Sequence, residues 1–458
     1  MKFKTFNPAT GKTIKEYSTN SSAEALKTAE QVKAAFSGWK KISLTERAAS
    51  MRKLAAVLKK NKEAYAKIMA MEMGKPITQG ISEVEKCAWT AEIFADNAAQ
   101  WLLEEHSQLG GKDHLVVFDP LGCILGIMPW NFPFWQVYRY AIPAMMAGNV
   151  CLLRHSNVCP QSALAIEKSF IEAGFPKNTF RTIITDHDAA AQLIASQHVD
   201  GVSLTGSVNA GSRVAELAGK NLKKVVLELG GSDPFVVLED ADIDVAAKNA
   251  AQARMLNTGQ SCIAAKRFIV VKKVADAFTK KFSEYMKTQK VGDPMKPETE
   301  VGPVVTLDQL EQIQKQVDTA VKQGAVIVTG GKRMKGDGFF FEPTILTDVR
   351  EGTCTAQEEV FGPVASIIVV QDEQEALAVA NRTEFGLGGS VWTKDTARGL
   401  RFARHIEAGI VCVNSIVRSD PRMPFGGIKK SGIGRELSKY GLHEFVNIKT
   451  IHVYEQPK

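Results

Sequence analysis

Residues 257–267, NTGQSCIAAKR, place a single cysteine, Cys262, directly after a Gly-Gln-Ser turn. A cysteine is a strong nucleophile when nearby cations or a helix terminus favour its thiolate, whereas a thiol buried among apolar side chains is inert. Taken alone, Cys262 is best interpreted as a structural thiol. A catalytic interpretation needs a base and a charge-stabilising group elsewhere in the chain.

Two further segments contain groups of that kind. Glu228 ends the apolar run KKVVLEL, where burial would raise the pKa of its carboxyl group and suit it to act as a general base. The segment SLTGSVNAG places Gly206 and Ser207 between a strand and a helix, where backbone N–H groups can bind a pyrophosphate. Each segment alone favours a structural interpretation: a salt-bridged strand end for Glu228, and an ordinary turn for a G-x-x-x-x-G spacing that misses the usual dinucleotide fingerprint.

The elements that must position these residues fall into three regions. Residues 22–109 contain long apolar patterns of helical spacing. From about residue 112, short apolar runs alternate with helical patterns, which predicts a parallel sheet with helices on both faces. A second series of the same kind follows, so we expect two consecutive α/β domains with a boundary near Gly230 and Gly231. The C-terminal NIKTIHVYEQPK contains a lone strand, which must pair within its own fold or across a subunit interface.

Composition narrows the class of protein. The 458 residues carry 57 Lys and Arg against 50 Asp and Glu, and the lysines are spread out, so we expect no nucleic-acid partner. Seven scattered cysteines without a CxxC pair or a histidine cluster indicate reduced thiols and no metal site. The polar N-terminus and the interrupted apolar stretch 123–153 predict neither a secretory signal nor a membrane span, and hence a cytoplasmic protein.

In combination, the motifs resemble those of the aldehyde dehydrogenase superfamily. PWNFP, LTGS, LELGG, GQSC, EEVFGPV and PFGGIKKSGIGRE follow the order and spacing of that family over essentially the whole chain. The resemblance implies an α/β fold with two Rossmann-like parallel-sheet domains and a small β oligomerisation element. The implied boundaries are 1–110 and 124–229 for the cofactor-binding domain, 230–430 for the catalytic domain, and 111–123 and 440–458 for the oligomerisation hairpin and C-terminal strand of a homodimer or homotetramer.

The resemblance also implies residue roles. Cys262 matches the nucleophile that attacks the aldehyde, Asn131 matches the amide that stabilises the oxyanion together with the Cys262 N–H, and Glu228 matches the base that hydrolyses the thioester. Because relatives that transfer the acyl group to coenzyme A typically lack this base, Glu228 favours release of a free acid. The residues implied in cofactor binding are Trp130, Arg154, Ser156, Asn157, Gly206, Ser207, Glu359 and Phe361.

Cofactor choice depends on the segment RHSN. NAD-preferring relatives commonly carry Lys at the position of Arg154 and Glu at that of Asn157. A glutamate there would hold the ribose hydroxyls and repel a 2'-phosphate. Asn157 stands in its place, with Arg154, His155 and Ser156 nearby. We therefore expect the enzyme to tolerate NADP as well as NAD, and we hypothesise a preference for NADP.

For the substrate, PWNFPFWQVYR and VNSIVRSDPRMPFGG resemble the shorter, bacterial succinate-semialdehyde dehydrogenases. Arg139 matches the residue that binds a distal carboxylate, with a salt-bridged arginine on a helix face as the equally favoured alternative. Leu256 replaces an arginine that many enzymes of this activity carry, so we expect lower affinity or broader specificity. Ala264 replaces a second cysteine, which predicts no disulfide switch there. The residues implied in substrate binding are Arg139, Ser419, Arg418, Trp135 and Phe425.

Three other interpretations stay open. An enzyme of broad specificity would use Phe132, Trp135 and Phe425 to line an apolar tunnel. A non-catalytic relative would be expected to lose one of the three catalytic residues, and all are present. A cysteine hydrolase without a nucleotide would need a histidine base, and none lies between His198 and His405.

Overall fold

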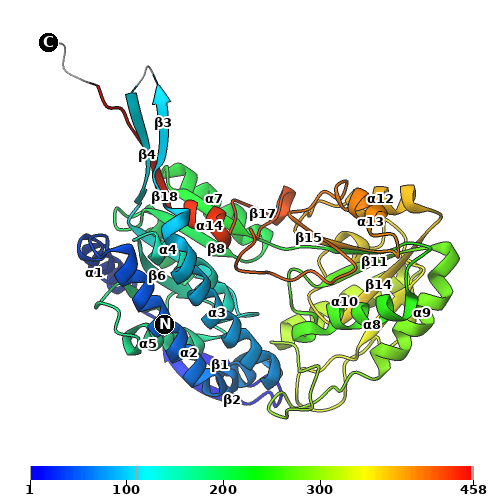
Figure 1. Cartoon of the computed structure of the whole chain (residues 1–458). Helices are drawn as coiled ribbons and strands as arrows, with labels where there is room; N and C mark the ends of the chain where they lie inside the picture. Colours follow the sequence, from blue (N-terminus) through cyan, green and yellow to red (C-terminus); the bar gives the residue numbers. More distant parts are fainter. Residues whose placement is uncertain (1, 110–111, 455–458) are drawn as a thin grey trace.

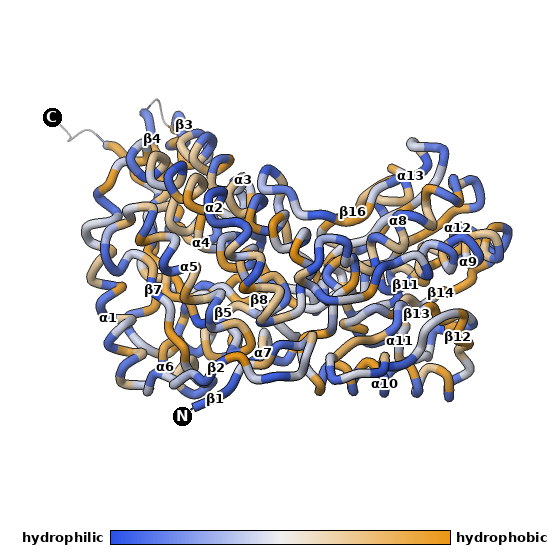
Figure 2. Tube along the Cα trace, turned by 90° about the horizontal axis from the view of Figure 1, so that it is seen from below, coloured by the Kyte–Doolittle hydropathy of each residue, from blue (hydrophilic) through white to orange (hydrophobic). Residues whose placement is uncertain are grey.

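The computed structural model describes residues 2–109 and 112–454. The chain forms two lobes that lie side by side, each built around one largely parallel sheet, and the views in Figure 1 and Figure 2 agree on this division. A smaller three-stranded sheet projects from the first lobe (Figure 1). The two consecutive α/β units predicted from the alternating pattern are therefore confirmed.

The first lobe contains a six-stranded sheet in the order β17-β9-β8-β5-β6-β7, parallel except for the short edge strand β17. Its strands are apolar runs buried on both faces, as expected where helices cover a parallel sheet. The strands are β5 (Cys123–Met128), β6 (Val150–His155), β7 (Phe180–Ile183), β8 (Gly201–Thr205), β9 (Lys224–Glu228) and β17 (Gly432–Ile433). The helices are α4 (Trp135–Met146), α5 (Pro160–Glu172), α6 (His187–Ala195), α7 (Val208–Lys220) and α14 (Ser438–His443).

The second lobe contains a seven-stranded sheet in the order β12-β13-β14-β11-β10-β15-β16, in which only β12 is antiparallel to its neighbour. The strands are β10 (Asp233–Val237), β11 (Ala265–Val271), β12 (Val326–Thr329), β13 (Thr344–Thr347), β14 (Val364–Val370), β15 (Gly388–Trp392) and β16 (Ile410–Val413). The helical segments are α8 (Ile243–Met255), η1 (Leu256–Gly259), α9 (Lys272–Lys287), α10 (Leu307–Lys322), α11 (Cys354–Gln357), α12 (Glu373–Asn381), α13 (Thr396–Ala403) and η2 (Lys429–Ser431). The chain crosses between the lobes at Gly230 and Gly231, where the sequence predicts a boundary.

The helical front end consists of α1 (Ser22–Trp39), α2 (Leu44–Met73) and α3 (Ile77–Trp101). Ser21 with Glu24 and Ser43 with Glu46 form capping boxes that satisfy the free N–H groups at the starts of α1 and α2. The expectation that helix continues to residue 109 is wrong at its end, because Glu105–Leu109 form strand β3. All five residues of β3 are exposed, so they carry no apolar period, and pairing with β4 makes this segment a strand.

The projecting sheet has the order β18-β4-β3 and is antiparallel throughout. Its strands are β3, β4 (Lys112–Pro120) and β18 (Val446–Ile451). The lone C-terminal strand thus pairs within its own chain, with Ile448 opposite Phe118. The predicted glycine turn at residues 110–111 and the last residues, 455–458, lie outside the described part of the chain.

An N-terminal antiparallel hairpin, β1 (Lys2–Phe6) and β2 (Thr13–Ser18), completes the fold. Within residues 2–109 and 112–454, no helix has the length and apolar character needed to cross a membrane. In the same described part of the chain, His, Cys, Asp and Glu side chains form no cluster able to hold a metal ion.

Candidate active site

The carboxyl ends of the parallel strands bring the first lobe's candidate residues to one edge of its sheet. Glu228 is the last residue of β9 and lies in register with Thr205 at the end of β8. Asn131 follows β5, and Asn157 follows β6. In open α/β sheets ligands bind outside this edge, so the fold alone places the site here.

Residues 257–262, here called the nucleophile turn, have unusual backbone conformations. Asn257, Thr258 and Gly259 are all left-handed, with φ of 54°, 58° and 72°. A non-glycine residue in this region costs about 1–2 kcal/mol, so other contacts must stabilise the turn. The Asn257 amide donates to the carbonyl of Asn131 at 2.7 Å, and the Thr258 hydroxyl donates to the carbonyl of Gly302 at 3.2 Å. These bonds explain why Asn-Thr-Gly precedes the cysteine.

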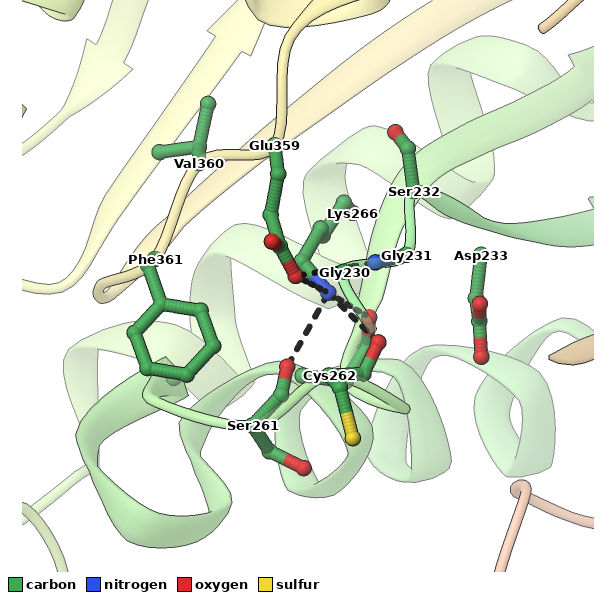
Figure 3. A network of polar contacts seen from close by, with 12 residues as sticks. Gly230, Gly231, Ser232, Asp233, Ser261, Cys262, Lys266, Glu359, Val360 and Phe361 are labelled. Carbon is green, nitrogen blue, oxygen red and sulfur yellow. Dashed lines mark hydrogen bonds and ion pairs between the residues drawn. The ribbon is translucent and has the colours of Figure 1, made fainter. Parts of the chain in front are cut away.

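A buried ammonium organises the residues around Cys262. Lys266 Nζ donates to the carbonyls of Ser261, Cys262 and Ala264 at 3.0, 2.8 and 3.2 Å, and it forms an ion pair with Glu359 at 3.4 Å. Figure 3 shows this ammonium between Glu359 and the turn, with the Cys262 sulfur pointing away from it. The lysine therefore holds the backbone of the turn while leaving the thiol free.

Two glycines allow the segment LELGG to pass close to this turn. A Cβ atom at Gly231 would lie 2.8 Å from the carbonyl oxygen of Cys262, and one at Gly230 would lie 2.4 Å from a carboxylate oxygen of Glu359. The Gly231 N–H donates to Glu359 at 3.1 Å. Because any side chain would push these segments apart, the glycine pair keeps Glu228, Cys262 and Glu359 in one site.

Burial disfavours the charged forms of both the Cys262 thiol and the Glu228 carboxyl group. Burial raises the pKa of Cys262 to about 12, while the positive charges of Arg139 and Lys266 oppose this shift. Burial also raises the pKa of the Glu228 carboxyl group, and the neighbouring Glu436 adds to the effect. Neither carboxyl oxygen of Glu228 has a hydrogen-bond partner among the described residues, so both are available to a water molecule or a proton. A buried carboxyl group with a raised pKa is a suitable general base.

Asn131 is buried and tied to the nucleophile turn. Its side-chain amide donates to the carbonyl of Gln260 at 3.1 Å. An asparagine amide has two N–H groups, so one stays available to a ligand beside Cys262. This bond fixes the Asn131 amide beside the nucleophile turn.

A tunnel between the lobes leads to the thiol. We call this cavity of about 780 Å³ the thiol tunnel, lined by residues of α3, α4, the nucleophile turn and the loop 415–425. Cys262 and Cys412 both line it, but only Cys262 lies within the network of Glu228, Asn131 and Lys266. All five residues expected to contact substrate line the thiol tunnel: Arg139, Ser419, Arg418, Trp135 and Phe425.

Arg139 is committed to partners inside the protein. Its guanidinium forms a buried ion pair with Glu436, donates to the Thr205 hydroxyl at 3.2 Å, and lies 4.5 Å from the centre of the Phe425 ring. The salt bridge that the sequence offered as the alternative interpretation of Arg139 is thus observed. It restricts, without abolishing, the access of Arg139 to a ligand.

A second cleft of about 1030 Å³, here called the interlobe cleft, is lined by the N-terminal hairpin, the ends of β6 and α2, and residues 305–308. Arg154, Ser156 and Asn157 line it as expected, whereas His155 points inward and bonds the carbonyl of Pro133 at 3.0 Å. His155 is therefore not available to a cofactor, which corrects its expected role near the phosphate. Burial lowers the pKa of His155 to about 4, so the ring is neutral at pH 7.

The other expected cofactor residues are arranged in two places. Trp130 meets Phe361 edge to face with 5.6 Å between ring centres. Ser207 caps α7, accepting from the N–H of Ala210, and Gly206 precedes it; neither lines the interlobe cleft.

The residues present fit a nicotinamide dinucleotide. In the interlobe cleft, Arg154 Nε and Asn157 Oδ1 are buried without a hydrogen-bond partner among the described residues. Buried polar groups are normally paired, so these atoms indicate a polar ligand. Ribose hydroxyls and a phosphate would supply the missing partners.

Sequence reasoning missed three charged residues of the site. Lys266 lies four residues after the nucleophile, Glu436 lies in the segment GRELS, and Lys86 lies on α3. A charged residue within an otherwise apolar stretch was the available signal for Lys266. The spacing of Ser82, Lys86 and Trp89 on one helical face was the signal for Lys86.

Fold and site together define a two-lobed α/β enzyme whose chemistry centres on a cysteine thiol and a buried carboxyl group. A profile of the aldehyde dehydrogenase family matches residues 1–451. The chain belongs to this family, which confirms the resemblance noted in its motifs.

Individual relatives resemble the chain over its whole length. A protein of Synechocystis sp. named probable succinate-semialdehyde dehydrogenase [NADP(+)] is 45% identical, with 99% of this chain and 100% of that protein covered. The crystal structure of succinic semialdehyde dehydrogenase from Streptococcus pyogenes in complex with NADP+ has a TM-score of 0.96 and 36% identity, covering 99% of this chain and 100% of that one. That of an NAD-dependent aldehyde dehydrogenase from Sinorhizobium meliloti has a TM-score of 0.97 and 33% identity, covering 100% of this chain and 92% of that one.

Proposed function

We propose that this aldehyde dehydrogenase oxidises succinic semialdehyde to succinate with NADP, and that it also accepts NAD. The observation that carries the proposal is the thiol tunnel, in which Cys262 shares one cavity with cationic and hydroxyl groups, Arg139, Arg418 and Ser419. A carboxylate on the substrate would be attracted by such groups. The names of the relatives support the same substrate.

In the first step, Glu228 accepts the proton of the Cys262 thiol and the sulfur bonds to the aldehyde carbon. The resulting thiohemiacetal oxyanion accepts hydrogen bonds from the free N–H of the Asn131 amide and from the Cys262 backbone N–H. One such donor contributes about 3–4 kcal/mol to the transition state. Lys266 keeps the turn in place during this step by binding its carbonyls.

Oxidation and hydrolysis complete the reaction. The nicotinamide ring, when bound, supplies a hydride acceptor. Loss of the hydride from carbon leaves a thioester on Cys262. After releasing the first proton to solvent, Glu228 takes a proton from water, whose oxygen bonds to the thioester carbon and displaces the sulfur. That proton passes to the departing sulfur, so the acid and the free thiol are released. The balance is one aldehyde, one water and one oxidised cofactor to one acid, one reduced cofactor and a proton.

Cofactor choice follows from Arg154, Ser156 and Asn157, which line the interlobe cleft, whereas the other assigned residues lie outside its lining. We assign Arg154, Ser156 and Asn157 to the adenosine ribose and its 2'-phosphate, Gly206 and Ser207 to the pyrophosphate, and Glu359, Phe361 and Trp130 to the nicotinamide ribose. Asn157 brings no negative charge against a phosphate, which supports NADP. We accordingly assign cofactor binding to residues 1–110 and 124–229 and catalysis to residues 230–430.

One observation favours a broader aldehyde specificity. Because Arg139 is paired with Glu436, its charge is partly neutralised within the protein. Leu256, Phe132 and Phe425 add apolar surface to the thiol tunnel. An enzyme for uncharged aldehydes is the second candidate.

Steady-state kinetics on the purified enzyme separate the candidates. We expect kcat/KM to be highest for succinic semialdehyde, lower for glutaric semialdehyde and lowest for hexanal, with NADP at least as effective as NAD. Equal kcat/KM for hexanal and succinic semialdehyde would favour the second candidate.

We also propose a homodimer or homotetramer assembled through the projecting sheet. Its outer strand β18 exposes a row of free backbone groups and the side chain of Ile448, which is 60% exposed. An open strand edge of this kind is a site for pairing with another chain.

A further inference from the structure

The side chain of Lys86 enters the thiol tunnel from α3. Its Nζ donates to the Ser419 hydroxyl at 2.6 Å and lies 4.4 Å from the centre of the Trp135 ring. Ser419 belongs to a loop 333 residues away in the sequence, so this contact joins opposite walls of the tunnel. Among the described residues, no carboxylate lies within ion-pair distance of Lys86.

The other charges of the thiol tunnel are paired within the protein, except that of the exposed Arg418. Arg139 pairs with Glu436, and the lining carboxylate of Asp420 pairs with Arg422 at 2.6 Å. Glu83 pairs with the buried Lys75 and accepts two backbone N–H groups. Arg418 has an exposed side chain. Lys86 is thus the partly buried cation whose charge is left for a ligand.

We propose that Lys86 binds the distal carboxylate of the aldehyde substrate, with the Ser419 hydroxyl as its neighbour in the same contact. The inference rests on the proposed function and deepens it, because it names the residue that selects a charged substrate. Leu256 contributes no charge from the nucleophile turn, so the positive charge is supplied by the opposite wall of the thiol tunnel. A lysine ammonium has three donors, enough for Ser419 and both oxygens of a carboxylate.

The local electrostatics agree with this role. Burial lowers the pKa of Lys86 to about 8 and Arg139 adds to the shift, while Cys87, Asp420 and Glu83 oppose it. A bound carboxylate would raise that pKa again and favour the charged ammonium. The ammonium form is present below pH 8 and is lost above it, so the preference for a charged substrate is expected to weaken as the pH rises through that value.

A comparison of two four-carbon aldehydes tests the proposal. Succinic semialdehyde carries the distal carboxylate, and butanal lacks it. In Lys86→Met we expect kcat/KM for succinic semialdehyde to fall by about tenfold or more, mainly through KM, because a charge-assisted contact is lost. With butanal, kcat and KM should change by less than about twofold, since no carboxylate is bound. Lys59→Met, which removes an exposed lysine of α2 paired with Glu92 of α3, is the matched control and should behave like wild type with both aldehydes.

The possible outcomes distinguish a failure of this inference from a failure of the proposed function. If wild type prefers succinic semialdehyde and Lys86→Met keeps the full preference, the role of Lys86 is refuted and the proposed function stands. If wild type does not prefer succinic semialdehyde over butanal, both the role of Lys86 and the proposed function are refuted. Should Lys86→Met fail to fold by circular dichroism, Lys86→Gln, which keeps a hydrogen-bond donor for Ser419, is measured with the same expected loss. Lys86→Arg should retain most of the preference, because it keeps the charge.

Discussion

The reactivity of Cys262 is decided by its immediate neighbours. Burial holds its thiol protonated, and the positive charges of Arg139 and Lys266 only partly offset this. Proton removal therefore requires a base within the site. We propose Glu228 for this role because its carboxyl group is buried, has a raised pKa and has no hydrogen-bond partner among the described residues. In the proposed mechanism, Cys262 and Glu228 exchange a proton although burial disfavours the charged form of each group.

Glu228 predicts a pH dependence and a kinetic signature. Because its pKa is raised, the active carboxylate form is lost as the pH falls through that raised value, well above the pH at which an exposed glutamate is protonated. Glu228→Gln should lower the steady-state kcat by about 10²-fold or more, since general-base assistance is lost. Because Glu228 also accepts the proton of the Cys262 thiol in the proposed mechanism, rapid mixing should show a slower burst of reduced cofactor as well.

In Glu228→Gln, the loss of activity at falling pH that we assign to Glu228 should be absent from the pH profile. A Glu228→Gln profile identical to that of wild type would assign the titration to another group, and an unchanged kcat would remove Glu228 from the mechanism.

Asn157 predicts a change of cofactor preference. A carboxylate in Asn157→Glu would repel the 2'-phosphate of NADP and accept hydrogen bonds from the ribose hydroxyls of NAD. We expect kcat/KM with NADP to fall by about tenfold or more, while that with NAD is kept or rises. Asn157→Gln changes size without charge and should shift the ratio far less. Equal loss with both cofactors in the glutamate variant would point to a folding defect instead.

At the scale of elements, one carboxylate of α3 positions the start of α4. Glu83 accepts from the backbone N–H groups of Phe134 and Trp135, both at 3.0 Å, and forms a buried ion pair with Lys75. The Lys75 ammonium lies 3.8 Å from the centre of the Phe132 ring. These contacts hold the turn that carries Asn131, so the position of the proposed oxyanion donor depends on helix α3.

Glu83→Ala should lower the free energy of unfolding by about 3–5 kcal/mol, because it leaves the Lys75 ammonium buried without its partner. Thermal unfolding followed by calorimetry measures the change. Glu85→Ala is the matched control on the same helix, since Glu85 forms an exposed ion pair with Lys62 and contributes little. Similar unfolding temperatures for the two variants would argue against a stabilising role for the buried pair.

At the scale of the whole molecule, the projecting sheet extends outward from the first lobe (Figure 1), and its strand β3 is exposed throughout. Its outer strand β18 contributes nothing to either cavity, so its exposed edge suits assembly.

Ile448→Glu should shift the protein to a smaller species, because a charge buried in an apolar contact is costly. Light scattering after size-exclusion chromatography gives the mass. Ile171→Glu, on α5 and 65% exposed, controls for surface charge and should leave the mass unchanged. An Ile448→Glu protein of wild-type mass would place the subunit contact elsewhere.

Much of the architecture could be predicted from local patterns. The buried strands appear in the sequence as short apolar runs, and the capped helices as periodic ones, because burial and hydrogen bonding act over a few residues. Glu105–Leu109 could not be recognised as a strand, since these residues are exposed and owe their conformation to β4. Local pattern likewise does not distinguish whether the lone strand β18 pairs within its own chain or with another subunit.

By itself, the sequence determined the chemistry: a thiol, a carboxylate and an amide in family motifs identify an aldehyde dehydrogenase. Only the tertiary structure decided which charges are free. Arg139, for which the sequence favoured a ligand contact and a salt bridge equally, is paired with Glu436. His155 points inward, and Lys86, an ordinary helical lysine in the sequence, reaches Ser419 across the thiol tunnel. The physical reason is that charges act through space, and their partners lie up to hundreds of residues away along the chain.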